Sequence, residues 1–114
     1  MTLFGTDGIR GRYGEYPLDD STIPNIGYAI SRSFNDKKIK KIFIAHDGRE
    51  SSNILCQKII DGIFFDREYQ IIYLGLFPTP ALTFILSQNS NLDAIGIEIT
   101  ASHNPYSDNG IKVF

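Results

Sequence analysis

Residues 42–75 have the sequence IFIAHDGRESSNILCQKIIDGIFFDREYQIIYLG, which indicates the fold more clearly than any other segment. Residues 42–45 are a short apolar run of the kind that forms a buried strand, and residues 70–74 form a second run that Gly75 ends. Between the two runs, residues 54–64 place apolar side chains along a broad helical face, as in a helix packed on a sheet. A strand, a helix and a second strand in this order predict a right-handed crossover and a parallel pair of strands.

The flanking segments continue this alternation of helix and strand. Apolar residues recur at helical spacing over residues 23–34, and the polar residues 19–22 offer an N-cap for that helix. The Thr-Pro pair at 79–80 is typical of a helix start, and residues 93–99 form a third predicted strand. We therefore expect an α/β domain with helices on both faces of a sheet.

Two further segments complete the predicted sheet. Residues 111–114 form a short last strand, and the Asp-Asn-Gly sequence at 108–110 predicts a tight turn before it. Because only about ten residues separate this strand from Ile99, a helical crossover does not fit, and the strand should run antiparallel or lie at an edge. Residues 5–16, with four glycines, predict a loop or short hairpin. The expected fold is a three-layer α/β/α domain with a mostly parallel, four-stranded mixed sheet.

Length and composition limit the chain to one domain, residues 1–114. The chain has a hydrophobic content of 42% and a charged content of 21%, which argue against intrinsic disorder. Its net charge of −2 argues against nonspecific nucleic-acid binding, because such binding needs a basic face. Cys56 is the one cysteine, which excludes an internal disulfide, and His46 and His103 add no zinc-ligand spacing. Because no apolar run approaches about 18 residues and no signal peptide is present, we expect a cytoplasmic protein with neither a membrane nor a nucleic-acid partner.

The polar loop after the third strand, residues 100–105, holds the first candidate chemistry. Ligands of parallel sheets gather at the carboxyl ends of the strands, where this loop and the loop after Ala45 both emerge. Ser102 is a candidate nucleophile or phosphate carrier. The adjacent His103 cannot be its base in the usual triad geometry, because neighbouring side chains diverge. The alternative is structural, with Ser102 and Asn104 forming a turn and His103 exposed at its rim.

Three cationic residues could act on a phosphate group near this loop. Arg10 lies in a glycine-rich segment that suits a bidentate phosphate contact, and the alternative is a surface arginine. Lys112 could neutralise a phosphorylated serine or transfer a proton, or it could be an ordinary edge lysine. Arg49 precedes Ser51 and Ser52 at a helix start, where an anion site is conceivable and a simple helix cap is favoured.

Glu98 interrupts the third predicted strand with a charge. It shares one strand face with Ala94 and Gly96. That face is either wet or covered by something polar, or the carboxyl group is buried with a raised pKa. We expect a partly exposed face at this position.

Four segments together resemble the α-D-phosphohexomutases. TASHNP at 100–105, followed by DNGIK at 108–112, is similar to the phosphoserine loop of that family, and FGTDGIRG at 4–11 is similar to its N-terminal signature. With FPTPAL at 77–82, this signature resembles the glucosamine-phosphate branch more than the phosphomannomutase/phosphoglucomutase branch. The resemblance extends over nearly the whole chain, with the motifs in matching order.

The resemblance implies a role for each matching residue. Ser102 would carry a phosphate group that passes to a sugar and returns from a bisphosphorylated intermediate, and a phosphate oxygen would ligate Mg²⁺. His103 and Lys112 would be the proton-transfer candidates, and Arg10 would steady the phosphoserine region. The remaining matched positions would bind phosphate or shape the loops: Thr6, Asp7, Arg49, Thr100 and Asn104.

The activity that the resemblance implies belongs to a larger enzyme. That enzyme would be an isomerase that interconverts glucosamine 6-phosphate and glucosamine 1-phosphate, or a mannose- or glucose-phosphate relative. Members of the family have four domains, with metal-binding aspartates in the second, and this chain has no Asp-x-Asp-x-Asp run. We therefore expect residues 1–114 to be the first domain, inactive alone and without tight Mg²⁺ binding. The implied substrate is a phosphosugar, and a homodimer is left open. The alternative is a stand-alone module that binds phosphate or a partner.

Overall fold

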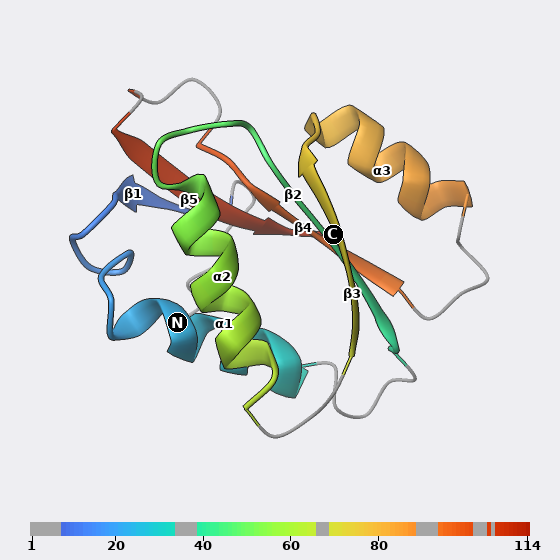
Figure 1. Cartoon of the computed structure of the whole chain (residues 1–114), viewed down its shortest axis with the longest axis horizontal. Coiled ribbons are helices and arrows are strands. Elements are labelled where there is room, and N and C mark those ends of the chain that lie inside the picture. Colours follow the sequence, from blue (N-terminus) through green and yellow to red (C-terminus); the bar gives the residue numbers. More distant parts are fainter. Residues whose placement is uncertain (1–7, 34–38, 66–68, 89–93, 102–104, 106) are drawn as a thin grey trace.

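The computed structural model describes residues 8–33, 39–65, 69–88, 94–101, 105 and 107–114, which form five strands and three helices (Figure 1). In chain order these elements are β1 (Ile9–Arg12), α1 (Thr22–Ser33), β2 (Lys41–His46), α2 (Ser52–Ile63), β3 (Gln70–Leu76), α3 (Thr79–Gln88), β4 (Ala94–Ile99) and β5 (Asp108–Val113). Within these ranges, no helix has the length and apolar character needed to cross a membrane.

The five strands form one mixed sheet in the order β1-β5-β4-β2-β3. β2 runs parallel to β3 and to β4, as the alternation of strand and helix predicted. β5 runs antiparallel to β4, which confirms the direction expected for the last strand, and it also runs antiparallel to β1. The sheet therefore has five strands rather than the predicted four.

The additional strand comes from the glycine-rich opening, which we had predicted to be a loop or hairpin. Residues 9–12 pair with β5, with Arg10 opposite Gly110 and Arg12 opposite Asp108. The same pairing makes residues 108–110, the predicted tight turn, the beginning of β5. Glycine-rich sequence is typical of loops, and the partner that stabilises this strand lies at the other end of the chain, so local sequence gave no signal for it.

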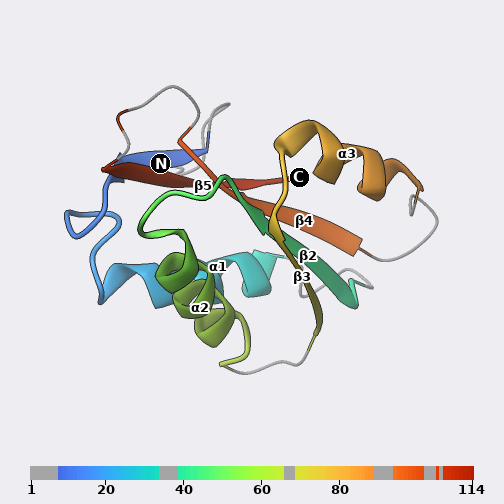
Figure 2. The same ribbon diagram turned by 45° about the horizontal axis from the view of Figure 1, so that its top comes forward.

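Helices cover both faces of the sheet, as expected for three layers (Figure 2). α1 and α2 lie together on one face, and α3 lies on the other. Ile95, Ile97 and Ile99 of β4 are buried in one cluster with apolar residues of α1 and α2. Fully buried members of this cluster include Ile23, Ile44, Leu55, Ile59 and Ile111.

The two helices on this face approach each other backbone to backbone. A Cβ atom added to Gly27 of α1 would overlap the carbonyl oxygen of Ile59. A Cβ atom added to Gly62 of α2 would overlap the carbonyl oxygen of Pro24. Glycine at these two positions therefore sets the distance between α1 and α2.

On the opposite face, α3 packs closely over Gly96 of β4. A Cβ atom added to Gly96 would lie 2.6 Å from Leu86 Cδ1 and 3.3 Å from both Cδ atoms of Leu82. Because residues of a strand alternate between faces, Glu98 points to this same side, and the beginning of α3 lies near it. The packing of α3 thus determines the surroundings of Glu98.

Candidate functional site

Asp47 joins the two loops that leave the carboxyl ends of β2 and β4. Its backbone N–H group donates to the carbonyl oxygen of Ile99 at 3.2 Å. Its Oδ2 atom accepts hydrogen bonds from Thr100 Oγ1 at 2.7 Å and from Arg49 Nε at 2.8 Å. The two loops that the sequence indicated at one sheet edge are therefore connected where they begin.

Arg49 holds the second half of the loop that follows β4. Its Nη1 atom donates to the carbonyl oxygen of Pro105 at 2.7 Å and to that of Asp108 at 3.3 Å. Only 8% of its side chain is exposed, and its ion pair with Asp47 orients the guanidinium group. The loop of residues 100–108 is thus tied at both ends. The helix-cap interpretation that we favoured for Arg49 does not account for these contacts.

Replacing Arg49 with lysine is expected to loosen this loop without unfolding the domain. Lysine keeps the charge but lacks the planar fork, so it cannot reach Asp47 and the two carbonyl groups at once. We expect faster amide hydrogen exchange at residues 100–110 and a free energy of unfolding lower by about 1–2 kcal/mol. Hydrogen–deuterium exchange and urea unfolding measure these changes.

The matched control for this substitution is Arg12→Lys. Arg12 is exposed at the end of β1, so its replacement should alter neither the exchange of residues 100–110 nor the stability. An Arg49→Lys variant whose loop exchanges as slowly as in the unsubstituted protein would contradict the assigned role.

Asn109 is a buried residue of this region that the sequence analysis missed. Its Nδ2 atom donates to Ser51 Oγ at 2.9 Å and to Ser52 Oγ at 3.2 Å, and its Oδ1 atom accepts from the Gly110 N–H group at 3.0 Å. These bonds link β5 to the start of α2. The Asn-Gly pair suggested a turn, and the partners of the side chain lie 57 and 58 residues away, so no local signal could have identified it.

The cations that we singled out on β1 and β5 share the face of the sheet on which α3 lies. Arg10 is directly opposite Gly110, and Lys112 is directly opposite Glu98, so alternation places all four on one side. A Cβ atom added to Gly110 would lie 3.1 Å from Arg10 Cγ, which shows that the stem of Arg10 crosses Gly110. α3 packs on β4 and β2, and β5 and β1 extend beyond it (Figure 1).

Glu98 is fully buried, so the partly exposed face that we expected is wrong. Neither carboxylate oxygen makes a well-formed hydrogen bond with a described residue, and the Thr79 hydroxyl at the start of α3 is the polar group that acts on the carboxyl. Burial raises the pKa of Glu98 to about 7, and the negative charge of Asp47 adds to this increase. The hydroxyl group of Thr79 and the charge of Lys112 oppose it. The glycine at position 96 explains the burial, because it lets α3 lie close to the strand.

Five predicted site residues lie outside the described part of the chain: Thr6, Asp7, Ser102, His103 and Asn104. The structure gives the two ends of the loop that contains three of them. Ala101 is buried at the start of this loop, and Arg49 holds Pro105 near its end. The structure describes the other four predicted site residues. They lie on the loops and strands around these two ends: Arg10, Arg49, Thr100 and Lys112.

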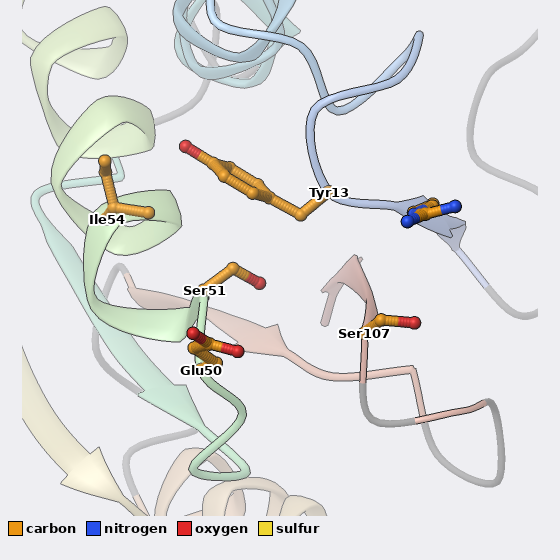
Figure 3. A pocket seen from close by; sticks show the side chains of 6 residues that line it. Tyr13, Glu50, Ser51, Ile54 and Ser107 are labelled. Carbon is orange, nitrogen blue, oxygen red and sulfur yellow. The ribbon is translucent and has the colours of Figure 1, made fainter.

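An open pocket of about 350 Å³ borders the same edge of the molecule (Figure 3). Its Ser51 also accepts a hydrogen bond from Asn109, and its Ser107 belongs to the loop of residues 100–108. None of the residues that we predicted for the site lines this pocket. The lining residues are Arg12, Tyr13, Glu50, Ser51, Ile54 and Ser107.

Known proteins with similar sequences carry closely related names. Over residues 1–114 the chain matches the family model described as "Phosphoglucomutase/phosphomannomutase, alpha/beta/alpha domain I". A phosphoglucosamine mutase of Campylobacter jejuni (strain 81-176) is 44% identical over 115 residues, which cover 100% of this chain and 25% of that protein. A phosphoglucosamine mutase of Solibacter usitatus is 40% identical, over 98% of this chain and 25% of that protein.

A solved structure has a similar fold as well as a similar sequence. It is the crystal structure of a phosphoglucomutase/phosphomannomutase family protein from Burkholderia thailandensis, with a TM-score of 0.78 and 28% sequence identity. The match covers 97% of this chain and 25% of that one. The chain therefore spans about a quarter of the length of the relatives that it matches.

Proposed function

The chain belongs to the phosphoglucomutase/phosphomannomutase family as its α/β/α domain I, and on this basis we propose that it is the phosphoserine domain of a phosphoglucosamine mutase. In this proposal the whole protein acts in the cytoplasm and interconverts glucosamine 6-phosphate and glucosamine 1-phosphate. The phosphate group passes through Ser102 and a bisphosphorylated sugar. The names of the relatives at 44% and 40% identity support glucosamine phosphate as the substrate, and mannose or glucose phosphate is the alternative.

The hydrogen-bonded frame around the loop of residues 100–108 is the observation that carries this proposal. A serine that gives its phosphate to one position of a sugar and takes it back from another must stay in place through both half-reactions. Asp47 holds the loop at Thr100, and Arg49 holds it at Pro105 and Asp108. Such a frame suits a reaction in which positioning and charge neutralisation supply most of the catalysis.

Charges near the ends of this loop fit a phosphorylated serine. A phosphate group on Ser102 would carry a charge of about −1.5 to −2, and Arg10 and Lys112 are cations on the neighbouring face of the sheet. Lys112 would also transfer a proton to or from the reacting sugar hydroxyl, with His103 as the other candidate. Arg49 already donates to two carbonyl groups and pairs with Asp47, so we assign it to positioning.

Mg²⁺ enters this proposal only through Ser102. Within the described ranges, no three His, Cys, Asp or Glu side chains are grouped so that they could hold a metal ion. The Asp47 Oδ2 atom is engaged by Arg49 and Thr100. The described residues therefore do not form a magnesium site, and a phosphate oxygen on Ser102 would be the ligand that this domain supplies.

Replacing Ser102 with alanine tests the proposed function. In the protein purified from its native cells, mass spectrometry should find phosphate on the peptide that contains Ser102. In the Ser102→Ala variant this phosphate should be absent, and turnover of glucosamine 6-phosphate should fall by a factor on the order of 10³ or more, because the group that carries the phosphate is lost. Residues 1–114 alone should show no turnover.

The control for this experiment is Ser107→Ala, an exposed position in the same loop that should keep both the phosphate and the turnover. Phosphate on a different residue, or full turnover by the Ser102→Ala variant, would overturn the proposal. Faster turnover of mannose 6-phosphate than of glucosamine 6-phosphate would assign the alternative substrate.

A further inference from the structure

His46 is a buried histidine beside the candidate site that the proposed function does not use. It is the last residue of β2, and 9% of it is exposed. It pairs with Ile99 of β4 on one side and with Leu76 of β3 on the other. Its backbone carbonyl oxygen accepts a hydrogen bond from the Phe77 N–H group at 3.0 Å. The backbone of His46 is therefore held between two strands, at the edge where the loop of residues 100–108 begins.

The imidazole ring of His46 has an anchored neighbour. Its centroid lies 6.0 Å from that of the Tyr73 ring of β3, and the two ring planes are tilted by 33°. The hydroxyl group of Tyr73 in turn donates to Asn53 Oδ1 of α2 at 3.1 Å. A ring that is buried against such a neighbour has few rotamers available, so the direction of its nitrogen atoms is fixed.

This ring accepts a hydrogen bond from the turn that follows β2. The Gly48 N–H group donates to His46 Nδ1 at 2.9 Å. A ring nitrogen that accepts a hydrogen bond carries no proton of its own, so in this contact the ring proton is on Nε2. The contact spans two residues, like the local turns that asparagine and aspartate side chains form with the backbone.

The turn needs such a contact, because glycine alone does not determine its conformation. Gly48 has a φ angle of 83°, in the left-handed region, and an added Cβ atom would lie 3.0 Å from Leu76 Cδ1. Glycine permits this conformation, and it permits many others as well. On either side of Gly48 are Asp47 and Arg49, which hold the loop of residues 100–108. Any other conformation at Gly48 would redirect both side chains.

We propose that His46 is a positioning residue for the loop of residues 100–108, and that it acts by fixing the conformation of Gly48 through its Nδ1 atom. The proposal rests on the proposed function, in which this loop carries the phosphoserine. The ring selects one conformation of a permissive glycine, and that conformation directs the side chains of Asp47 and Arg49 to the two ends of the loop. His46 therefore acts on the loop through the two residues that hold it.

Two substitutions separate the acceptor atom from the bulk of the ring. In His46→Asn, the side-chain Oδ1 atom takes the place of Nδ1, so the acceptor is kept and the ring is lost. In His46→Phe, the ring is kept and the acceptor is lost. We expect amide hydrogen exchange at residues 47–49 and 100–110 to be about 3- to 10-fold faster in His46→Phe, as for the loss of one ordinary hydrogen bond. In His46→Asn it should stay close to the unsubstituted rate. A role in packing alone predicts the reverse order.

Nuclear magnetic resonance of the unsubstituted chain tests the hydrogen bond itself. In mildly alkaline solution, where imidazole rings are neutral, we expect a scalar coupling between the Gly48 amide nitrogen and His46 Nδ1, and the nitrogen shift of an unprotonated Nδ1. A ring proton on Nδ1 in place of Nε2 would overturn the proposal, and so would a His46→Asn loop that exchanges faster than the His46→Phe loop. Where His46→Phe does not fold, His46→Gln replaces it, because the glutamine amide lies one atom further along the side chain, at the place of Nε2.

Turnover by the whole protein extends the test to the proposed function. We expect His46→Phe to lower kcat by a similar factor, about 3 to 10, with little change in KM, and His46→Asn to recover most of that loss. The exchange and resonance measurements need neither a phosphosugar nor phosphate on Ser102. Full turnover by Ser102→Ala would overturn the proposed function and leave those measurements as they are, whereas equal exchange in the two His46 variants would refute the positioning role alone.

Discussion

The substitution Gly62→Ala is expected to lower the free energy of unfolding by about 3 kcal/mol, at the upper end of the usual cost of overpacking. Gly62 lies within α2, where alanine would otherwise stabilise the helix by about 1 kcal/mol. Its added methyl group would overlap the Pro24 carbonyl oxygen and press on the backbone nitrogen of Tyr28. These are backbone atoms of α1 and cannot rotate away, so the helices would have to separate. Helix propensity and packing thus predict effects of opposite sign.

Urea unfolding of Gly62→Ala and of three comparison variants measures this effect. Gly27→Ala affects the same crossing from α1 and should also destabilise the protein, and the double variant should cost less than the sum, because one separation of the helices relieves both overlaps. Gly11→Ala is the steric control, since a Cβ atom there would meet only Pro17 Cδ at 3.9 Å. A Gly62→Ala protein more stable than the unsubstituted one would show that α1 and α2 are not in backbone contact.

Glu98 is expected to make the stability of the protein fall as the pH rises from about 4.5 to about 7. Its pKa is raised in the folded state from an ordinary 4.5 to about 7, so the folded protein binds this proton more tightly than the unfolded chain does. The stability linked to this proton is complete below pH 4.5 and is lost as the pH approaches 7. A shift of this size corresponds to about 3 kcal/mol.

Comparing the pH dependence of unfolding in two variants isolates this contribution. Between pH 5 and pH 8, the free energy of unfolding of the unsubstituted protein should fall by about 2–3 kcal/mol more than that of Glu98→Gln, which has no proton to lose. Glu50→Gln, which alters an exposed side chain, should keep the unsubstituted slope. Parallel curves for Glu98→Gln and the unsubstituted protein would mean that Glu98 keeps an ordinary pKa in the folded state.

The parts of the fold that sequence alone predicted are those stabilised by local patterns. The apolar runs at 42–45 and 70–74 became β2 and β3 with boundaries a few residues wider, and the helices between strands formed where apolar spacing indicated. The sequence analysis did not predict β1 or the beginning of β5, because these two segments form strands by pairing with each other. Glycine at positions 8 and 110 and the Asp-Asn-Gly sequence give the local preferences of turns, and pairing across the whole chain overrides them.

The candidate site also has features that the sequence predicted and features that it did not. The loops after β2 and β4 meet as the rule for parallel sheets predicted. The common face of Arg10 and Lys112 was not predicted, because it follows from the pairing of β1 with β5. The burial of Glu98 was not predictable, because it depends on how closely α3 approaches Gly96. The two carbonyl contacts of Arg49 were not predictable either, because every residue has a backbone carbonyl group and its side chain does not show which carbonyl accepts a hydrogen bond.

Those carbonyl contacts also determine which changes this loop can tolerate over evolution. Arg49 recognises the main chain of Pro105 and Asp108, which every amino acid offers in the same form. A substitution of Pro105 or Asp108 therefore leaves in place the carbonyl group that Arg49 binds. In this contact, mutation and protein engineering have more freedom at the two residues that are held than at the arginine that holds them.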